Sequence, residues 1–210
     1  MDRNAFVKLL AKEFYPVLRA QGFKGSGTLL RRADGLFHHI VHIQGSTTAR
    51  DCYVNLGAHL EFLPSEGGSR AFSPTDFDEP SCSFRSRLDS PFQDQRWAYG
   101  ASEADANLSI QGIIKAWNEQ GRPFFGRFSS QRETENLERL IQEHGAPESH
   151  PNFNLIAARI ALHVGDKQRA FRIAASALER VPAQATGLRL RIKEFIGSLP
   201  DPREPDSPAG

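Results

Sequence analysis

The chain has 210 residues, of which 39% are hydrophobic and 24% charged, with a formal net charge of +1. The length suits one sizeable domain, or one domain with an appended subdomain, and the composition is that of an ordinary globular protein. The small net charge gives no electrostatic reason to expect a nucleic acid or an anionic membrane as partner. No stretch reaches the roughly 18 apolar residues of a membrane span, and the charged N-terminal residues lack the apolar core of a signal peptide.

The first part of the chain combines one helix with a run of strands. Residues 2–20 place apolar side chains at helical spacing, and Asp2 is a suitable cap. Three strand-like segments follow, at residues 28–32, 36–44 and 51–63. The ADG at 33–35 predicts a tight turn, because Asp and Gly tolerate positive φ. The short connections between these segments predict an antiparallel meander.

A long segment rich in Gly, Pro, Ser and acids, residues 64–81, separates this meander from a fourth strand at 81–88. Its composition and weak periodicity indicate a loop, and loops of this length often carry function. The strand alternates, so Arg85 and Arg87 are expected to share one of its faces. A helix follows at 102–120 and ends at the sequence GRPFFGRF.

The remaining chain is predicted to be helical up to about Leu199. A helix with a serine cap and a glycine stop is expected at 129–145, and residues 155–182 read as two helices joined at Gly165–Asp166. Small residues allow these helices a close approach, at Ala157, Ala161, Ala170, Ala174 and Ala177. Gly165–Asp166, Ala170, Ala177, Leu178 and Pro182 resemble one tetratricopeptide-type helical hairpin, although a solenoid needs about three or more copies.

These elements predict an α+β fold. An antiparallel sheet of about four strands, flanked by helices, occupies residues 1–128. A helical subdomain at 129–199 is expected to dock on it. The Pro-rich tail, residues 200–210, is expected to be disordered.

Several pieces of sequence, taken in order, resemble an uncharacterised bacterial family known as a domain of unknown function. They are QGFKGSGTLLRRADG, FHHIVHIQ, YVNLGAHLEFL, CSFRSRL, Trp97 and PFFGRF. The resemblance covers residues 5–128 approximately and rests on spaced apolar, Gly and Arg positions. It implies a fold, but it assigns no activity or cofactor to any residue.

The histidines of FHHIVHIQ raise the question of a metal site. His38 and His42 lie about 13 Å apart along a strand, too far to share an ion, whereas zinc ligands converge within about 2.1 Å of one atom. His59 and Glu61, with one histidine of the neighbouring strand, could still form a site for metal-assisted hydrolysis. We favour the alternative that the histidines line the half-exposed face of an antiparallel sheet.

Other chemical signatures are weak. No nucleophile elbow, P-loop or dinucleotide fingerprint is present in the sequence. Cys52 and Cys82 match no metal or redox spacing, which indicates reduced cytoplasmic thiols, and Cys82 is expected to be a buried strand residue rather than a nucleophile. The acids of the long loop are candidates for contact with a cation or a basic partner, at Asp76, Asp78 and Glu79.

Basic residues gather at two places. Arg85 and Arg87 are expected either to pair with Glu61 or Asp89, or to form a patch for a phosphate, a carboxylate or an acidic protein. Between residues 153 and 198, eight basic residues against three acidic ones give +5. We interpret this segment as a solvated exterior, with an anionic partner as the alternative and Phe171 and Phe195 as core.

The sequence therefore favours a protein-binding domain over an enzyme, and it implies no cofactor, metal or membrane. The predicted contact residues are Asp76, Asp78, Glu79, Arg85, Arg87 and Trp97. A concrete version is a cytoplasmic immunity protein that neutralises a bacterial toxin through charge and shape complementarity. The alternatives are a metal-dependent hydrolase that uses the strand histidines and an adaptor that uses its helical hairpin.

Overall fold

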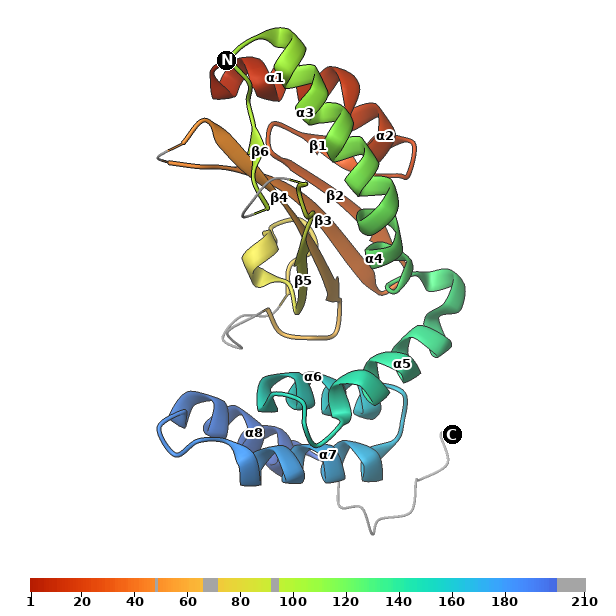
Figure 1. Ribbon diagram of the computed structural model, residues 1–210. Helices are drawn as coiled ribbons and strands as arrows, with labels where there is room; N and C mark the ends of the chain where they lie inside the picture. The colour runs from red at the N-terminus through yellow and green to blue at the C-terminus, as the bar shows by residue number, and fades with distance from the viewer. Residues whose placement is uncertain (48, 66–71, 92–94, 200–210) are drawn as a thin grey trace. The chain divides into compact units, whose positions relative to one another are not determined.

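The computed structural model describes residues 1–47, 49–65, 72–91 and 95–199. The chain divides into two compact units, Met1–Gln131 and Arg132–Gly210. The first unit is an antiparallel sheet with helices and the second is helical, which confirms the predicted α+β class (Figure 1). The predicted docking of the second unit on the first remains a prediction. The tail, predicted to be disordered, lies outside the described residues.

The sheet is an antiparallel meander. Its strands are β1 (Lys24–Ser26), β2 (Leu29–Asp34), β3 (Phe37–Gly45), β4 (Asp51–Leu60), β5 (Phe84–Arg87) and β6 (Trp97–Ala98). The first five follow one another in space, and β6 pairs with β4 beyond the end of β5. The predicted hairpin between β2 and β3 is confirmed, with Asp34 opposite Phe37 and Gly35 at φ +61°. The short strands β1 and β6 were not predicted.

The predicted N-terminal helix is in fact two helices, α1 (Arg3–Glu13) and α2 (Tyr15–Arg19). The break has a local cause, because Pro16 lacks an N–H and its ring would clash with a carbonyl one turn earlier. Proline is accommodated in the first turn of α2 instead. Asp2 caps α1 as predicted, and its side chain accepts a hydrogen bond from the Ala5 N–H at 2.8 Å.

The second predicted helix continues further than expected. α3 (Glu103–Ala116) begins with a reciprocal capping box between Ser102 and Asp105. It then passes through a π-helical turn, η3 (Trp117–Gly121), into α4 (Arg122–Gly126). Pro123 lies in the first turn of α4, so the GRPFFGRF sequence contains a helix rather than ending one.

Both faces of the sheet are covered, by different parts of the chain. Helices α1 to α4 lie across one face (Figure 1). The main apolar cluster there includes Leu30, Val41, Leu56, Phe6, Phe14, Trp117 and Phe125. Against the other face the chain brings Phe72, Phe77, Cys82 and the short helix η1 (Glu79–Ser81), which pack on Ile40 of β3.

Gly57 of β4 allows this second cover to lie close to the sheet. A Cβ at this position would stand 2.7 Å from both Cys82 Sγ and Ile40 Cγ2. We therefore expect Gly57→Ala to lower the free energy of unfolding by about 1–3 kcal/mol through overpacking, measured by urea denaturation. Gly126→Ala is the matched control, since no atom lies within 4 Å of a Cβ there. An equal loss in both variants would contradict this account.

The second unit contains α5 (Glu133–Gly145), α6 (Pro151–His163), α7 (Lys167–Arg180) and α8 (Thr186–Ser198). The predicted junction of α6 and α7 is confirmed, because Gly165 has φ +88° and Asp166 caps α7 by accepting from the Arg169 N–H at 2.9 Å. The tetratricopeptide likeness of this hairpin remains a prediction. Among the described residues, no helix has the length and apolarity to cross a lipid bilayer.

Two details of this unit differ from expectation. The serine cap predicted for α5 is wrong, because the turn η4 (Ser130–Arg132) precedes the helix and leaves Arg132 at the cap without a side-chain bond. Phe171 is 42% exposed and is not a core residue, whereas Phe195 is buried as predicted.

Candidate functional site

The three acids of the long loop have three different surroundings. Asp76 is exposed and has no side-chain partner among the residues described. Asp78 caps η1, where its carboxylate accepts from the N–H and the hydroxyl of Ser81. Glu79 is 8% exposed and lies 3.6 Å from Arg85. Its burial raises the pKa of the Glu79 carboxyl, although Arg85 opposes the shift. Of the three acids, only Asp76 and Asp78 are therefore exposed to solvent.

The two arginines of β5 are held by partners that the sequence did not indicate. Arg85 pairs with Glu79 rather than with Glu61 or Asp89. Arg87 donates from Nε to the Asn55 Oδ1 at 2.8 Å, and its guanidinium lies 4.0 Å from the centre of the Tyr53 ring. The ion pairs expected with Glu61 or Asp89 are wrong: Glu61 lies beside His38, and the Asp89 carboxylate accepts from the Gln95 amide.

A chain of polar side chains runs across three strands at this point. Asn55 lies opposite Arg87 on one side and His42 on the other. It is 2% exposed, accepts from Arg87, and donates from Nδ2 to the Gln44 Oε1 at 2.7 Å. Both ends of the buried Asn55 amide are thus satisfied, and the Arg87 side chain is held in one orientation.

These side chains line a polar hollow of about 640 Å³, which we call the arginine groove. Its lining residues are Gln44, Asn55, Glu79, Pro80, Arg85, Ser86, Arg87, Asp89 and Gln95. It brings together three of the six predicted contact residues: Glu79, Arg85 and Arg87. The sequence did not indicate Gln44 and Asn55. Strand alternation places them on the arginine face only once the cross-strand register is known.

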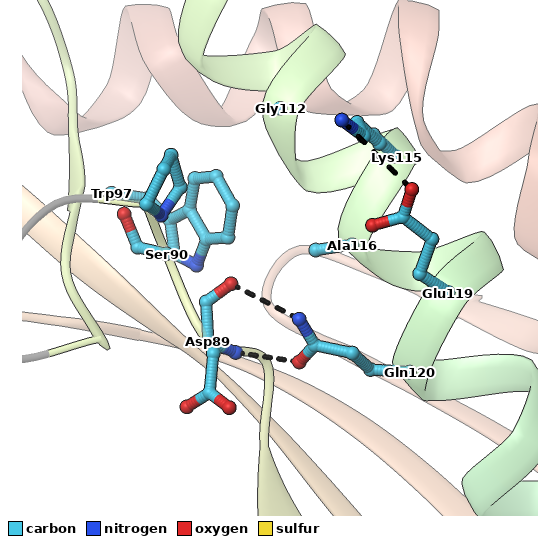
Figure 2. Close-up of a pocket in the computed structure, with 9 residues that line it drawn as sticks. Asp89, Ser90, Trp97, Gly112, Lys115, Ala116, Glu119 and Gln120 are labelled. Atoms are coloured by element: carbon cyan, nitrogen blue, oxygen red, sulfur yellow. Dashed lines mark hydrogen bonds and ion pairs between the residues drawn. The ribbon is translucent and has the colours of Figure 1, made fainter.

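Trp97 lies elsewhere. It is 1% exposed and belongs to the main apolar cluster. Figure 2 shows its indole ring at the wall of a second pocket of about 280 Å³, between α3 and the segment that contains Asp89. Gln120 bridges the two sides, accepting from the Asp89 N–H at 2.8 Å and donating to the Asp89 carbonyl at 3.4 Å. Trp97 is thus a buried wall residue and not an exposed contact.

The strand histidines alternate as predicted, and His42 is half exposed as expected, but the other three are buried. His38 lies opposite His59 on one face, while His39 points to the other face. Their exposed fractions are 6%, 0% and 0% for His38, His39 and His59. The expectation of half-exposed rings is wrong for these three because aromatic side chains cover the sheet on both sides of them. Phe72 stacks on His59 at 4.4 Å between ring centres, and Phe125 lies 4.8 Å from His39.

The ring nitrogens of His39 and His59 are already engaged. His39 Nδ1 accepts from the Arg32 Nε at 3.1 Å, so Nε2 carries the proton and donates to the Phe128 carbonyl at 2.8 Å. His59 Nδ1 accepts from the Ser83 N–H at 3.2 Å, and Nε2 donates to the Leu63 carbonyl at 3.1 Å. Burial lowers the pKa of His39 to about 3 and that of His59 to about 4. Both are neutral rings without a spare lone pair.

Among the predicted metal ligands, His38 and Glu61 lie close to each other. His38 Nε2 lies 3.6 Å from a carboxylate oxygen of Glu61. Its strand neighbour His59 is committed to Ser83 and Leu63. Within the described part of the chain, no three His, Cys, Asp or Glu side chains are placed to hold a metal ion.

One protein family, described as "Domain of unknown function (DUF4304)", matches residues 14–127. The chain belongs to this family. The match confirms the resemblance to a domain of unknown function and spans the six strands, helices α2 to α4 and the arginine groove. Helices α5 to α8 lie outside it. Comparisons with curated proteins and with solved structures give no match.

The two cysteines of the DUF4304 domain are free and buried. Burial raises the pKa of the Cys52 thiol to about 12, with the Asp51 carboxylate adding to the shift. Burial also raises the pKa of the Cys82 thiol, and Glu79 and Asp78 contribute. Because the thiolate is the reactive form, both groups are poor nucleophiles in the folded protein.

We expect neither cysteine of the DUF4304 domain to react with a thiol reagent at pH 7 in the native state. Both should react once the protein is unfolded in denaturant, because the thiols then recover their ordinary pKa and access. Ellman's reagent followed by mass spectrometry measures this. Rapid labelling of Cys82 in the native protein would contradict the assignment and reopen a nucleophilic role.

Proposed function

We propose that this DUF4304 protein is a non-catalytic protein-binding domain, and more specifically a cytoplasmic immunity protein that neutralises a cognate bacterial toxin. The observation that carries the proposal is the arginine groove. Arginine and tyrosine are enriched among residues that dominate binding energy, and an arginine that is fixed before binding loses less entropy on contact. Arg87, held by Asn55 and stacked on Tyr53, has this arrangement.

The chemistry of the other candidate groups supports the same proposal. The nitrogens of His39 and His59 serve hydrogen bonds within the fold, and the thiols of Cys52 and Cys82 have raised pKa values. These groups are therefore engaged in holding the fold. Two buried cysteines that are not joined in a disulfide also fit the proposed cytoplasmic location.

The experiment that tests the proposal is affinity capture of the tagged full chain from its native cell lysate, followed by mass spectrometry. We expect one stoichiometric partner that is toxic when expressed alone and harmless when co-expressed with this chain. Arg87→Gln should weaken both capture and protection. The matched control is Arg122→Gln, since Arg122 is exposed on α4 and does not line the groove.

Three results would overturn the proposal. The first is that no stoichiometric partner is captured. The second is that a captured partner binds wild type and Arg87→Gln equally well. The third is stoichiometric zinc or manganese in protein purified without a metal-binding tag, which would favour the hydrolase alternative built on His59, Glu61 and a histidine of the neighbouring strand.

A further inference from the structure

We propose that the arginine groove is a carboxylate site, which takes an aspartate or glutamate side chain of the partner between Arg87 and Gln44. This inference rests on the proposed function and adds the chemistry that the groove recognises. Two observations carry it. One is the direction of the hydrogen bonds that join Gln44, Asn55 and Arg87, and the other is the pairing of charged side chains in the groove.

Arg87 sets the direction of the hydrogen bonds along this row of side chains. A guanidinium has only donors, so the Asn55 oxygen must face Arg87 and the Asn55 nitrogen must face the Gln44 oxygen. The unused group of Gln44 is then its NH₂. No described residue accepts from this NH₂ or from the terminal nitrogens of Arg87. The groove therefore presents donors on both sides of Asn55, and a ligand that fits them must supply acceptors.

The charges of the groove single out Arg87. Its lining includes two arginines and two acids, so its formal charge is balanced. Glu79 is paired with Arg85, and the carboxylate of Asp89 accepts from the Gln95 amide. Arg87 contacts an uncharged amide and a ring, and among the described residues no acid is in hydrogen-bond contact with it, although Glu79 interacts with it through space. A planar guanidinium whose two terminal nitrogens have no acceptor within the described ranges matches a carboxylate bidentately, which an ammonium group does not.

Because Glu79 lies beside Arg85, the inference predicts that one substitution strengthens binding and that another weakens it. The Glu79 carboxylate forms an ion pair with Arg85 at 3.6 Å, so it competes with a ligand for this arginine. Glu79→Gln should release Arg85 and strengthen carboxylate binding, whereas Arg87→Gln should abolish it. Arg87→Lys should weaken binding about tenfold or more, because it keeps the charge but loses the fork-shaped pair of donors.

The experiment is a titration of the ¹⁵N-labelled full chain, followed by the NMR signals of the Arg87 Nε–H and of the Asn55 and Gln44 side-chain amides. The first probe is a blocked glutamate, N-acetyl-glutamate methylamide, and its uncharged match is the blocked glutamine. Acetate serves as a free carboxylate. We expect the three signals to move with blocked glutamate, to move much less with acetate, and to stay in place with blocked glutamine. Arg122→Gln should respond as wild type does.

Each other outcome overturns the inference. Equal shifts with glutamate and glutamine, shifts confined to other regions, or no shift would show that the groove does not read a carboxylate. Equal affinity for acetate and blocked glutamate would make the groove a site for free carboxylates and not for a partner's side chain. These results are separable from the proposed function. A captured partner that depends on Arg87, with no glutamate preference, leaves that function standing, and glutamate binding without a captured partner removes it.

Discussion

His39→Leu is expected to lower the free energy of unfolding of the sheet unit by about 1–3 kcal/mol. The leucine leaves the Arg32 guanidinium with the Gln21 carbonyl but without its His39 acceptor, and it leaves the Phe128 carbonyl without its donor, in a site where His39 is fully buried. Urea denaturation measures the effect. Both tryptophans of the chain, Trp97 and Trp117, lie in this unit, so fluorescence reports its unfolding alone.

A double-mutant cycle separates this contact from a general packing defect. Arg32→Met removes the half-buried guanidinium, and the double variant Arg32→Met/His39→Leu should lose clearly less stability than the sum of the two single variants. The reason is that the second change removes a donor already left unpaired by the first. Additive losses, or a loss below about 1 kcal/mol for His39→Leu, would show that the pair does not stabilise the fold.

Acid is expected to destabilise the protein well above the pH range of its carboxylates. His39 and His59 have native pKa values of about 3 and about 4, against about 6.5 in an unfolded chain. Between these values the unfolded chain binds protons that the native protein does not, so stability falls as the pH falls. The contribution is complete above about pH 7.5, and about 4 kcal/mol should be lost between about pH 6.5 and 4.5.

Urea denaturation at a series of pH values measures this loss. The His39→Leu variant supplies the internal check, because it lacks one of the two titrating rings. Its stability should fall about half as steeply over the same range. A flat profile for the wild type would mean that both rings are protonated in the native state, which contradicts their hydrogen bonds to Arg32 and Ser83.

Much of the sheet was predictable because its signals are local. Period-two alternation placed Arg85 and Arg87 together, and the ADG sequence located the β2–β3 turn. The break between α1 and α2 was equally local, but the prediction gave too little weight to Pro16. The strands β1 and β6 are too short to produce a periodic signal.

The site was less predictable because it depends on contacts between distant segments. Asn55 meets Arg87 through the register of β4 and β5, which lie on either side of the long loop. The burial of His38 and His59 depends on Phe72, whose segment has no periodicity to indicate that it folds back on the sheet. Sequence patterns therefore indicated which side chains share a face, but not what covers that face or which partners fix them.

The edges of the sheet are formed by very short strands. β1 has three residues and β5 has four, and β5 carries two arginines. A long, flat edge invites another chain to extend the sheet, whereas short and charged edges discourage such growth. We therefore expect this domain to resist fibrillar aggregation and strand exchange. A partner that binds it is expected to read side chains across a surface rather than to add a strand of its own.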